Sequence, residues 1–278
     1  MSHERKYIEL KQFDDREQQF AWLMQNKIAL TAQRKSFKKE ADAYSVTSFA
    51  LDERGNAIKD GNTSISADAT ILHVRSIINT TKILDSHSDV HIDDLWKKSL
   101  KENIENYLVQ EHSFTFAGII SDKVKAYTKT MTWKELGFPW PGTTQALVFD
   151  SILTKDRNPF MFEQYRKGYV KNHSVGMRYI KDYMCIDSTD YPQEKDNWDK
   201  YIIDVVNADV ATAKGYFWAV TEGKIIEGSA VTRGSNFVTP TQSITEGKNI
   251  EAAAGTSKNE PGNHSLRRTE LINLLKKF

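Results

Sequence analysis

The feature that most constrains the fold is a succession of apolar, β-branched runs between Thr70 and Pro240. The clearest of them are TILHVRSIIN, YLVQEHSFTFAGIISD, KVKAYTKTM, QALVFDSIL, YVKNHSVGMRYI, GYFWAV and KIIEGSAV. Short runs rich in Val, Ile, Thr, Tyr and Phe, bounded by turn residues, are typical of β-strands. We therefore expect a β-rich centre with helices at its margins, which is an α+β fold.

Helical patterns lie at one end of this region and inside it. From Asp14 to about Glu40, an apolar face at helical spacing predicts an amphipathic helix, and its residues are Phe20, Leu23, Met24 and Ile28. Its basic end, RKSFKKE, is interpreted as a solvated helix end in preference to a partner-binding segment. LWKKSLKENIENYL predicts a second helix, and residues 159–167 predict a third.

Other segments predict loops. The prolines and glycines of GFPWPGTT mark a loop, and TEGK predicts a turn between the strands GYFWAV and KIIEGSAV. The stretch from Asp187 to Lys200 is highly charged and has no apolar period, so we expect an exposed insertion there.

The two ends of the chain differ in composition from its centre. In residues 43–69, ERGN and DGN suit turns between strands, so residues 1–69 are predicted to be an extension made of a helix and a β-hairpin. Residues 70–241 form the central domain. From Gln242 to Asn263 the polar composition predicts a flexible linker, because it cannot bury enough apolar surface to fold. A short C-terminal helix is predicted to complete residues 242–278.

The charge balance and the cysteine count exclude several classes of partner and site. Lys and Arg number 38 against 37 Asp and Glu, and a net charge of +1 gives no long-range attraction to nucleic acid or an anionic membrane. We expect neither a secretory leader nor a membrane span, because no run of about 18 apolar residues occurs. Cys185 is the single cysteine, which excludes an internal disulfide and a cysteine-rich zinc module. We interpret it as a small buried residue.

Three polar residues interrupt otherwise apolar runs and could carry chemistry. In YLVQEHSFTF, strand alternation would place His112 on one face with Leu108 and Phe114. In YVKNHSVGMRY, Ser174 faces away from its apolar neighbours, and the nearby glycine leaves room for a substrate backbone. In KIIEGSAV, Glu227 is costly to bury unless it is paired. Serine, histidine and an acid are the minimal set for nucleophilic acyl transfer.

Each of these residues also has an ordinary structural explanation. His112 could be a core histidine, Ser174 a strand serine, and Glu227 a carboxylate at the rim of a sheet. His173 competes with His112 as a base. It adjoins Ser174 in sequence, but neighbouring strand residues point to opposite faces, so His173 is poorly placed to accept the proton of the serine.

A second polar cluster alternates along the chain at Asp85, His87, Asp89 and His91. On a strand, all four side chains would share one face, which suits a metal site. A solvated polar edge strand is the simpler explanation, and we favour it.

The order and wording of several motifs resemble the prohead proteases of tailed bacteriophages, a family that is similar in fold to the herpesvirus assembly proteases. DSHSDVHIDDLWKKSLKEN is similar to the opening segment of the family, and YLVQEHSFTFAGI is similar to its histidine strand. GYVKNHSVGMRY resembles the serine strand, G-x-x-x-x-x-S-x-G-[FM], and KIIEGSAVTRGSN resembles the acid strand. The resemblance covers about Lys82 to Pro240, and its spacing is similar to a divergent branch such as that of crAss-like phages.

The resemblance implies a mainly antiparallel, β-barrel-like core with flanking helices, and makes residues 70–241 a protease domain. It implies a serine endopeptidase with Ser174 as nucleophile, His112 as general base and Glu227 as third member, without a cofactor. The expected substrates are the phage scaffold, the major capsid protein precursor and the protease itself. The expected location is the host cytoplasm, inside the assembling prohead. A homodimer is a further candidate assembly, and neither nucleic acid nor membrane is an expected partner.

Some residues depart from the pattern of the family. Ser113 follows the histidine where the family often has Asp, and TRGSN replaces the usual PAN-like turn. GFPWPGTT and the stretch from Asp187 to Lys200 look like insertions. The candidate oxyanion donors are the N–H near Val175, and Arg178 or Arg233. Two other functions remain open: a non-catalytic assembly or scaffold component that keeps the protease fold and binds through its terminal helices, and a hydrolase that uses a metal at the Asp85 to His91 cluster.

Overall fold

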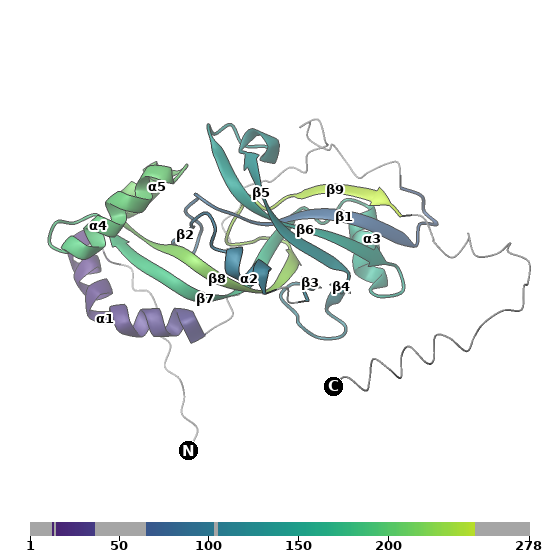
Figure 1. The fold of residues 1–278 in the computed structure, drawn as a ribbon, viewed down its shortest axis with the longest axis horizontal. Coiled ribbons are helices and arrows are strands. Elements are labelled where there is room, and N and C mark those ends of the chain that lie inside the picture. The colour runs from purple at the N-terminus through teal and green to yellow at the C-terminus, as the bar shows by residue number, and fades with distance from the viewer. Residues whose placement is uncertain (1–12, 14, 37–64, 103–104, 248–278) are drawn as a thin grey trace, which may run out of the picture. The chain divides into compact units, whose positions relative to one another are not determined.

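Two β-sheets form the framework of the protein in the computed structural model, which describes residues 13, 15–36, 65–102 and 105–247 (Figure 1). The first sheet is antiparallel, with the strand order β5-β6-β1-β9. Its strands are β1 (Ile71–Thr80), β5 (Val124–Thr132), β6 (Thr143–Thr154) and β9 (Thr241–Glu246). The described residues belong to one compact unit that ends at Gly247.

The second sheet is mixed and is organised around its longest strand, β8. Its strands are β2 (Asp89–His91), β3 (Leu108–Gln110), β4 (Ile119–Ser121), β7 (Asn172–Ile186) and β8 (Tyr216–Val231). β7 pairs antiparallel with β8 along its whole length, and β2 and β3 run parallel to the other edge of β8. β8 is therefore the strand on which distant parts of the chain converge.

The main hydrophobic core lies where the two sheets pack together. It includes Ile78 and Phe149 of the first sheet and Val175 and Ala230 of the second. The backbone of β8 approaches the first sheet closely at Gly228, because a Cβ there would lie 2.6 Å from a ring carbon of Phe149. A larger residue at Gly228 would push the sheets apart.

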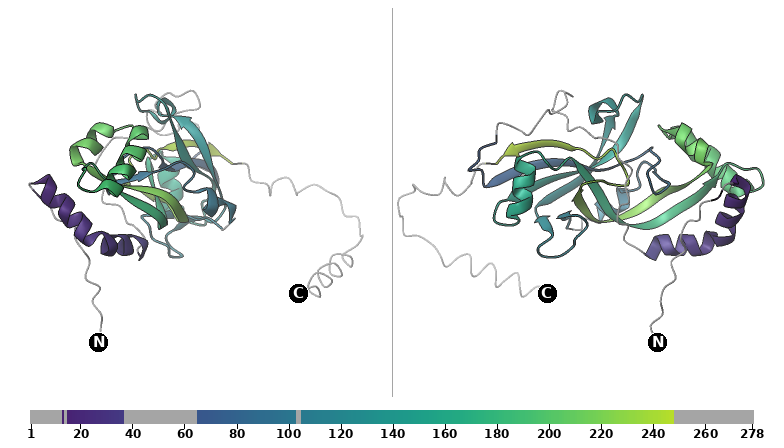
Figure 2. Two further views of the ribbon diagram at one scale, coloured as in Figure 1. Left: turned by 60° about the vertical axis from the view of Figure 1, so that its left-hand side comes forward. Right: turned by 180° about the vertical axis from the view of Figure 1, so that it is seen from behind.

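Beyond this core, β7 and β8 continue as a long ribbon, with β2 along part of the other edge of β8 and helices on both faces (Figures 1 and 2). α1 (Arg16–Ser36) covers one face, and α4 (Pro192–Tyr201) and α5 (Ala208–Lys214) cover the other. Successive strand residues pack on opposite sides, so that Met184 contacts the α1 cluster and Cys185 the α4 and α5 cluster. Burial raises the pKa of the Cys185 thiol, in agreement with the predicted buried residue.

The remaining helices are short. They are α2 (Lys97–Lys101), α3 (Pro159–Arg166) and the 3₁₀ turns η1 (Lys134–Leu136) and η2 (Ile202–Asp204). α3 begins where the sequence predicts: the Asn158 side chain accepts a hydrogen bond from the Met161 N–H, and Pro159 occupies the first turn. The predicted loop GFPWPGTT is confirmed up to Gly142, and Trp140 packs there against Phe138 and Trp133.

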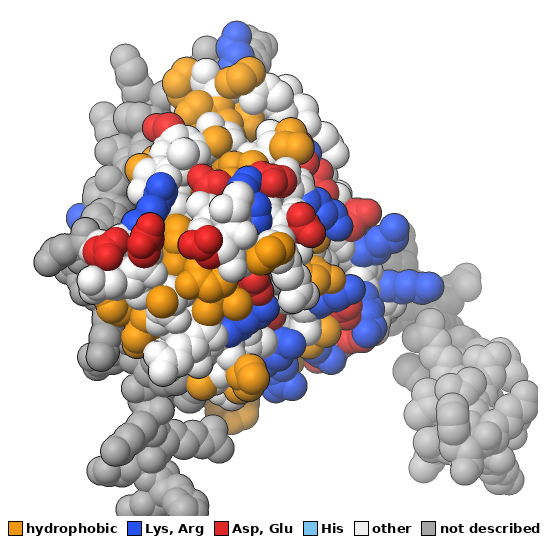
Figure 3. All heavy atoms as spheres, turned by 90° about the vertical axis from the view of Figure 1, so that its left-hand side faces the viewer, with side chains coloured by type: hydrophobic (Ala, Val, Ile, Leu, Met, Phe, Trp, Pro, Cys, Tyr) orange, Lys and Arg blue, Asp and Glu red, His pale blue; other side chains and the backbone are white. Residues whose placement is uncertain are grey.

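The predicted α+β class is confirmed. The strands of the described residues do not close into a barrel; they form two sheets instead of the expected barrel-like core. None of the helices in the described ranges is both long and apolar enough to cross a membrane. At the end that carries α1 and α4, charged side chains of both signs lie among apolar ones (Figure 3). This face therefore offers no extended patch of one charge.

The predicted turn at TEGK is wrong. GYFWAV and KIIEGSAV belong to the single strand β8, and Glu222, Gly223 and Lys224 stay paired with β7 across small register shifts. The glycine serves close packing here: a Cβ on Gly223 would lie 2.7 Å from Met177 and 2.9 Å from the Trp96 ring.

Two other predictions about helices need correction. The stretch from Asp187 to Lys200 contains nearly all of α4, whose Glu194 and Trp198 are buried, with Glu194 paired to Lys27. One tryptophan and one paired carboxylate are too sparse to produce an apolar period. The helix predicted over LWKKSLKENIENYL is only the five residues of α2, and Leu108 already belongs to β3.

The predictions for the ends of the chain are tested only in part. The N-terminal helix is confirmed over α1, although Ile28, expected on its apolar face, is exposed. Residues 242–246, expected in the linker, belong to β9 and pair with β1. Residues 37–64, with most of the predicted hairpin, and residues 248–278, with the rest of the linker and the C-terminal helix, lie outside the described residues.

Candidate active site

The candidate site is built on the face of β7 and β8 that points away from the core. Ser174 of β7 lies opposite Ser229 of β8, and Gly176 lies opposite Glu227. Side chains directly opposite one another on antiparallel strands share a face, as do residues two apart on one strand. The register therefore places Ser174, Ser229 and Glu227 on one face, whereas Gly228 lies on the core face.

His112 reaches this face from a strained turn after β3. β3 lies alongside β8 with Val109 opposite Ser229, and the strand ends at Gln110. Glu111 and His112 both have positive φ, 47° and 56°, which costs about 1–2 kcal/mol for each non-glycine residue. The prediction that His112 shares a strand face with Leu108 and Phe114 is wrong, because the backbone turns before it reaches His112.

Two hydrogen bonds hold His112 on β8. Its Nδ1 lies 2.9 Å from Oε1 of Glu227, and its backbone N–H donates to Oγ of Ser229 over 2.8 Å. The side chains of His112 and Glu227 are buried, 5% and 0% exposed. A carboxylate accepts the ring proton, so the contact places that proton on Nδ1 and makes Nε2 the basic nitrogen. The structure thus brings together two of the three predicted catalytic residues by direct contact.

The third residue, Ser174, is brought to the same place by strand register. It is 7% exposed, whereas Ser229 opposite it is completely buried. The hydroxyl of Ser229 accepts the His112 N–H and lies 3.3 Å from the carbonyl oxygen of Val109. Because Ser229 is enclosed and bonded to the backbone, Ser174 is the serine of this pair that can meet a substrate.

A pocket of about 440 Å³ opens next to these residues. Asn172 and Val231, which form the next pair on the same face as Ser174 and Ser229, line it, as does Glu111 beside His112. The rest of its wall is largely apolar and contains Phe160, Met161, Gln164, Tyr169, Val170, Lys171, Gln110, Ala230 and Thr232. The two aromatic residues of the wall, Phe160 and Tyr169, are mostly exposed and extend the apolar surface outward. The site therefore adjoins a surface suited to apolar side chains.

His173 lies on the opposite face, as expected for the neighbour of a strand residue. It is completely buried, its Nε2 lies 2.9 Å from the hydroxyl of Tyr165, and its Nδ1 lies 3.1 Å from the carbonyl of Thr239. Burial lowers the pKa of His173 to about 4. A neutral histidine bonded inside the core has a structural role, and it does not compete with His112 as a base.

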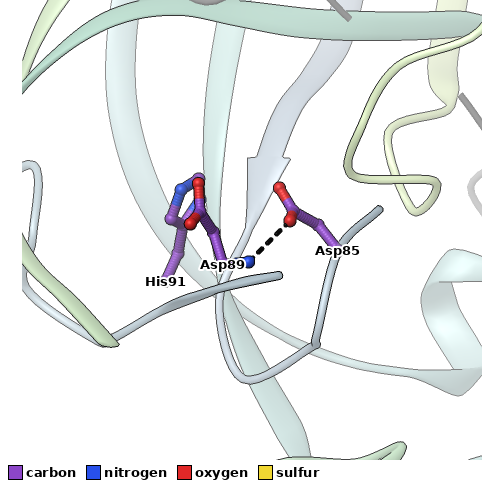
Figure 4. A group of neighbouring side chains, drawn as sticks. All are labelled: Asp85, Asp89 and His91. Atoms are coloured by element: carbon purple, nitrogen blue, oxygen red, sulfur yellow. Dashed lines mark hydrogen bonds between the residues drawn. The ribbon is translucent and has the colours of Figure 1, made fainter. Parts of the chain in front are cut away.

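The second polar cluster is only partly assembled. Ligand atoms of Asp85, Asp89 and His91 lie within 4.8 Å of one another, and all three residues are buried (Figure 4). Asp85 precedes β2 in a tight turn, where its carboxylate accepts the N–H groups of His87 and Asp89 over 2.9 and 2.8 Å. A solvated edge strand with all four side chains on one face is therefore wrong.

The carboxylate of Asp89 already has two strong contacts. Arg34 of α1 lies 2.6 Å from one of its oxygens, and the Tyr179 hydroxyl donates to the other over 2.5 Å. Nδ1 of His91 lies 2.8 Å from the side-chain amide of Asn79. Oxygen and imidazole donors suit a divalent metal, but a guanidinium beside the carboxylate repels a cation. These contacts favour a structural ion pair over a metal centre.

The basic end of the first helix, RKSFKKE, was expected to be solvated, and this prediction is wrong at Arg34, which is largely buried. Its side chain is 12% exposed, and its Nε lies 2.9 Å from a carboxylate oxygen of Asp182. Burial by itself would lower the pKa of Arg34, but the Asp89 carboxylate, together with Tyr179 and Asp182, raises it above its ordinary value. Arg34 therefore stays charged and ties α1 to the ribbon.

The expected oxyanion donors differ in their surroundings. The Val175 side chain packs in the core, while Arg178 and Arg233 are exposed. Sequence reasoning missed Ser229, which contacts His112 directly. The signal was present: Ser229 follows Glu227 by two residues in KIIEGSAV, which places both on one strand face.

Comparisons of the chain with protein-family models, with curated proteins and with solved structures found no match.

Proposed function

We propose that the protein is a serine endopeptidase in which Ser174 is the nucleophile, His112 the general base and Glu227 the residue that orients the base. The observation that carries this proposal is the buried contact between Nδ1 of His112 and the Glu227 carboxylate, next to a serine and an apolar pocket. An acid on Nδ1 and a basic Nε2 are what a serine hydrolase requires of its histidine.

The proposed reaction follows from these positions. Nε2 of His112 takes the proton of the Ser174 hydroxyl as Oγ bonds to the scissile carbonyl carbon. Glu227 stabilises the imidazolium that forms, and the imidazolium then protonates the leaving amine as the peptide bond breaks. Water hydrolyses the resulting ester by the same route and regenerates Ser174. No step requires a cofactor.

A polypeptide substrate suits the surroundings of Ser174. The pocket beyond Asn172 and Val231 is apolar, and exposed rings at its edge extend the surface that a chain could contact. Together with the motif resemblance, this supports processing of the phage scaffold, the major capsid protein precursor and the protease itself inside the assembling prohead of a host cell. The herpesvirus protease-like fold and a homodimer are parts of the same proposal, and both rest on the motifs.

The alternative is an assembly component that keeps the protease fold without activity. It would bind partners through its terminal helices. The apolar face of α1 is already buried on the β7–β8 ribbon through Phe20, Leu23 and Leu30, which leaves less of that helix for a partner. We therefore favour the enzyme.

Cleavage of a capsid precursor tests the proposed function. The chain is incubated with the precursor of a tailed-phage major capsid protein, and the products are identified by mass spectrometry. The parent is expected to cut the amino-terminal region, and Ser174→Ala is expected to cut nothing while keeping its melting temperature. Processing by Ser174→Ala at the parental rate would refute the assignment of the nucleophile.

A further inference from the structure

The turn that carries His112 is held in a conformation that its own residues disfavour. Glu111 and His112 are consecutive non-glycine residues with positive φ, at the end of the three-residue strand β3. Such a pair persists only when its surroundings fix it. The direction of the imidazole therefore depends on the contacts that fix this turn.

Besides the contact between the His112 ring and Glu227, two backbone N–H groups of the turn donate to β8. The Glu111 N–H donates to the Ala230 carbonyl over 2.9 Å, and the His112 N–H donates to Oγ of Ser229 over 2.8 Å. The acceptor of the first is a backbone carbonyl, and that of the second is a side-chain hydroxyl. Ser229 and His112 are both buried, so the loss of this hydroxyl would leave an amide without its acceptor in a place that water does not easily fill.

Ser229 also lies at the centre of the proposed catalytic group. It faces Ser174 across the strands and follows Glu227 by two residues on the same face of β8. One hydroxyl thus links the backbone of the proposed base to the strand that carries the proposed acid, opposite the proposed nucleophile.

We infer that Ser229 is a positioning residue: its hydroxyl fixes the backbone of His112 so that the imidazole faces Glu227 on one side and Ser174 on the other. This inference rests on the proposed function. Ser229 itself touches no substrate, since it is completely buried, and it acts through His112. A displacement of about 1 Å in a catalytic group can lower a rate by about 10²-fold.

A matched control is a serine of α2 that bonds to the same strand, β8. Oγ of Ser99 accepts the backbone N–H of Ile225 over 2.9 Å, and Ser99 is buried as well. Ser99→Ala and Ser229→Ala each remove a buried hydroxyl that accepts a backbone N–H. The first hydroxyl accepts the N–H of a β8 residue, and the second belongs to a β8 residue. A purely structural role for Ser229 would make the two variants alike.

The experiment measures reaction of the full chain with a fluorophosphonate probe, which forms an ester with an activated serine by displacing fluoride. The maximal labelling rate and the half-saturating probe concentration are determined separately for the parent, Ser229→Ala, Ser229→Thr and Ser99→Ala. We expect Ser229→Ala to lower the maximal rate about 10- to 100-fold with little change in half-saturation. Ser99→Ala is expected to stay within about twofold, and Ser229→Thr, which keeps the hydroxyl, is expected to recover most of the rate.

A second measurement does not depend on catalysis or on whether Thr fits. Amide hydrogen exchange of His112, followed by NMR, should be faster in Ser229→Ala than in the parent, and unchanged in Ser99→Ala. Parental labelling by Ser229→Ala, an equal loss in Ser99→Ala, or unaltered exchange at His112 would overturn the role of Ser229 and leave the proposed function standing. If the parent itself is not labelled, the proposed function fails, and this inference fails with it.

Discussion

Two buried groups in which a basic side chain meets a carboxylate lie along the paired strands β7 and β8. Near the middle of the strand pair, Arg34 lies between Asp89 and Asp182, and farther along β8, His112 lies against Glu227. The guanidinium of Arg34 also stacks over two rings, Tyr179 at 4.5 Å and Trp218 at 4.6 Å. Carboxylates and aromatic rings thus enclose the guanidinium of Arg34.

The group at His112 has different neighbours. The backbone N–H of His112 donates to Ser229, Ser174 lies opposite Ser229 on β7, and a pocket opens beside these strands at Asn172 and Val231. Arg34 has a raised pKa and cannot exchange a proton near neutral pH, whereas an imidazole can accept one. Burial of a charged pair does not by itself identify an active site. A nucleophile, an exchangeable proton and space for a substrate distinguish the second group from the first.

The largest expected effects are at the proposed acid and base, Glu227 and His112. In Glu227→Gln the geometry can persist, but the amide offers a donor to the ring and favours the wrong tautomer, which costs roughly 10⁴-fold in kcat in a serine protease of known mechanism. His112→Ala should cost at least as much. Because the residues act as a unit, the double variant should be no worse than His112→Ala alone. Single-turnover cleavage of a capsid-precursor peptide provides the rates.

A loss below about tenfold in Glu227→Gln, or losses that multiply in the double variant, would make Glu227 a structural carboxylate. His112 and Glu227 would then be a structural pair, like Arg34 with Asp89 and Asp182.

At the other group, the expected effect is on stability. Arg34→Met leaves Asp89 and Asp182 buried without their guanidinium, and breaking a buried pair costs about 3–5 kcal/mol. Lys35→Met is the control, because Lys35 is half-exposed and 4.0 Å from Asp182, so its loss should cost less than about 1 kcal/mol. Urea denaturation gives both values. Equal costs for the two variants would contradict a closed structural group.

The third prediction concerns His173, the neighbour of Ser174 on the core face. Its pKa is lowered to about 4 by burial, below its ordinary 6.5, so acid protonates the unfolded chain first. The contribution of the neutral His173 side chain to the free energy of unfolding is therefore fully present above pH 6.5. It is lost as the pH falls toward 4, at no more than about 1.4 kcal/mol per pH unit. His173→Gln should flatten this part of the stability curve.

The same variant separates the two histidines. Cleavage by His173→Gln should stay within about tenfold of the parent at pH 7.5, because only His112 acts as base. A loss as large as that of His112→Ala would place His173 in the catalytic group.

The smallest expected effect is at the pocket. Gln164 lies on its wall, and Gln164→Trp should fill part of it and lower kcat/KM for a polypeptide by about tenfold, on the order of one lost apolar side-chain contact. Lys167→Trp is the control, since Lys167 is exposed directly after α3, the helix that carries Gln164, and does not line the pocket. Equal kcat/KM values for the two variants would mean that substrates do not use this pocket.

The sequence predicts what local patterns determine. The β-rich runs form strands, α3 begins at Pro159 as predicted, and Glu227 is the carboxylate inside an apolar run for which a partner was expected. The partner itself, His112, was identified by motif order, and the structure places the two side chains in contact. Alternation along one strand was sufficient to place the side chains of Ser174 and His173 on opposite faces of β7.

The predictions that failed concern features that depend on contacts between residues far apart in sequence. TEGK has the composition of a turn, yet β7 holds it in β8, and YLVQEHSFTF alternates like a strand although its backbone turns at Glu111. Arg34 is buried by carboxylates 55 and 148 residues away, which no local pattern reveals. Local composition cannot report a partner that only the fold supplies.

Labelling by a fluorophosphonate probe tests the central claim most directly, because it requires an activated serine and no knowledge of the substrate. The full chain is reacted with and without a chelator, digested, and the modified peptide is sequenced by mass spectrometry. We predict one adduct, on Ser174, that survives chelation and is absent from Ser174→Ala and strongly reduced in His112→Ala. No adduct, an adduct on another serine such as Ser229, or labelling that is unaffected by His112→Ala would contradict the proposed serine endopeptidase.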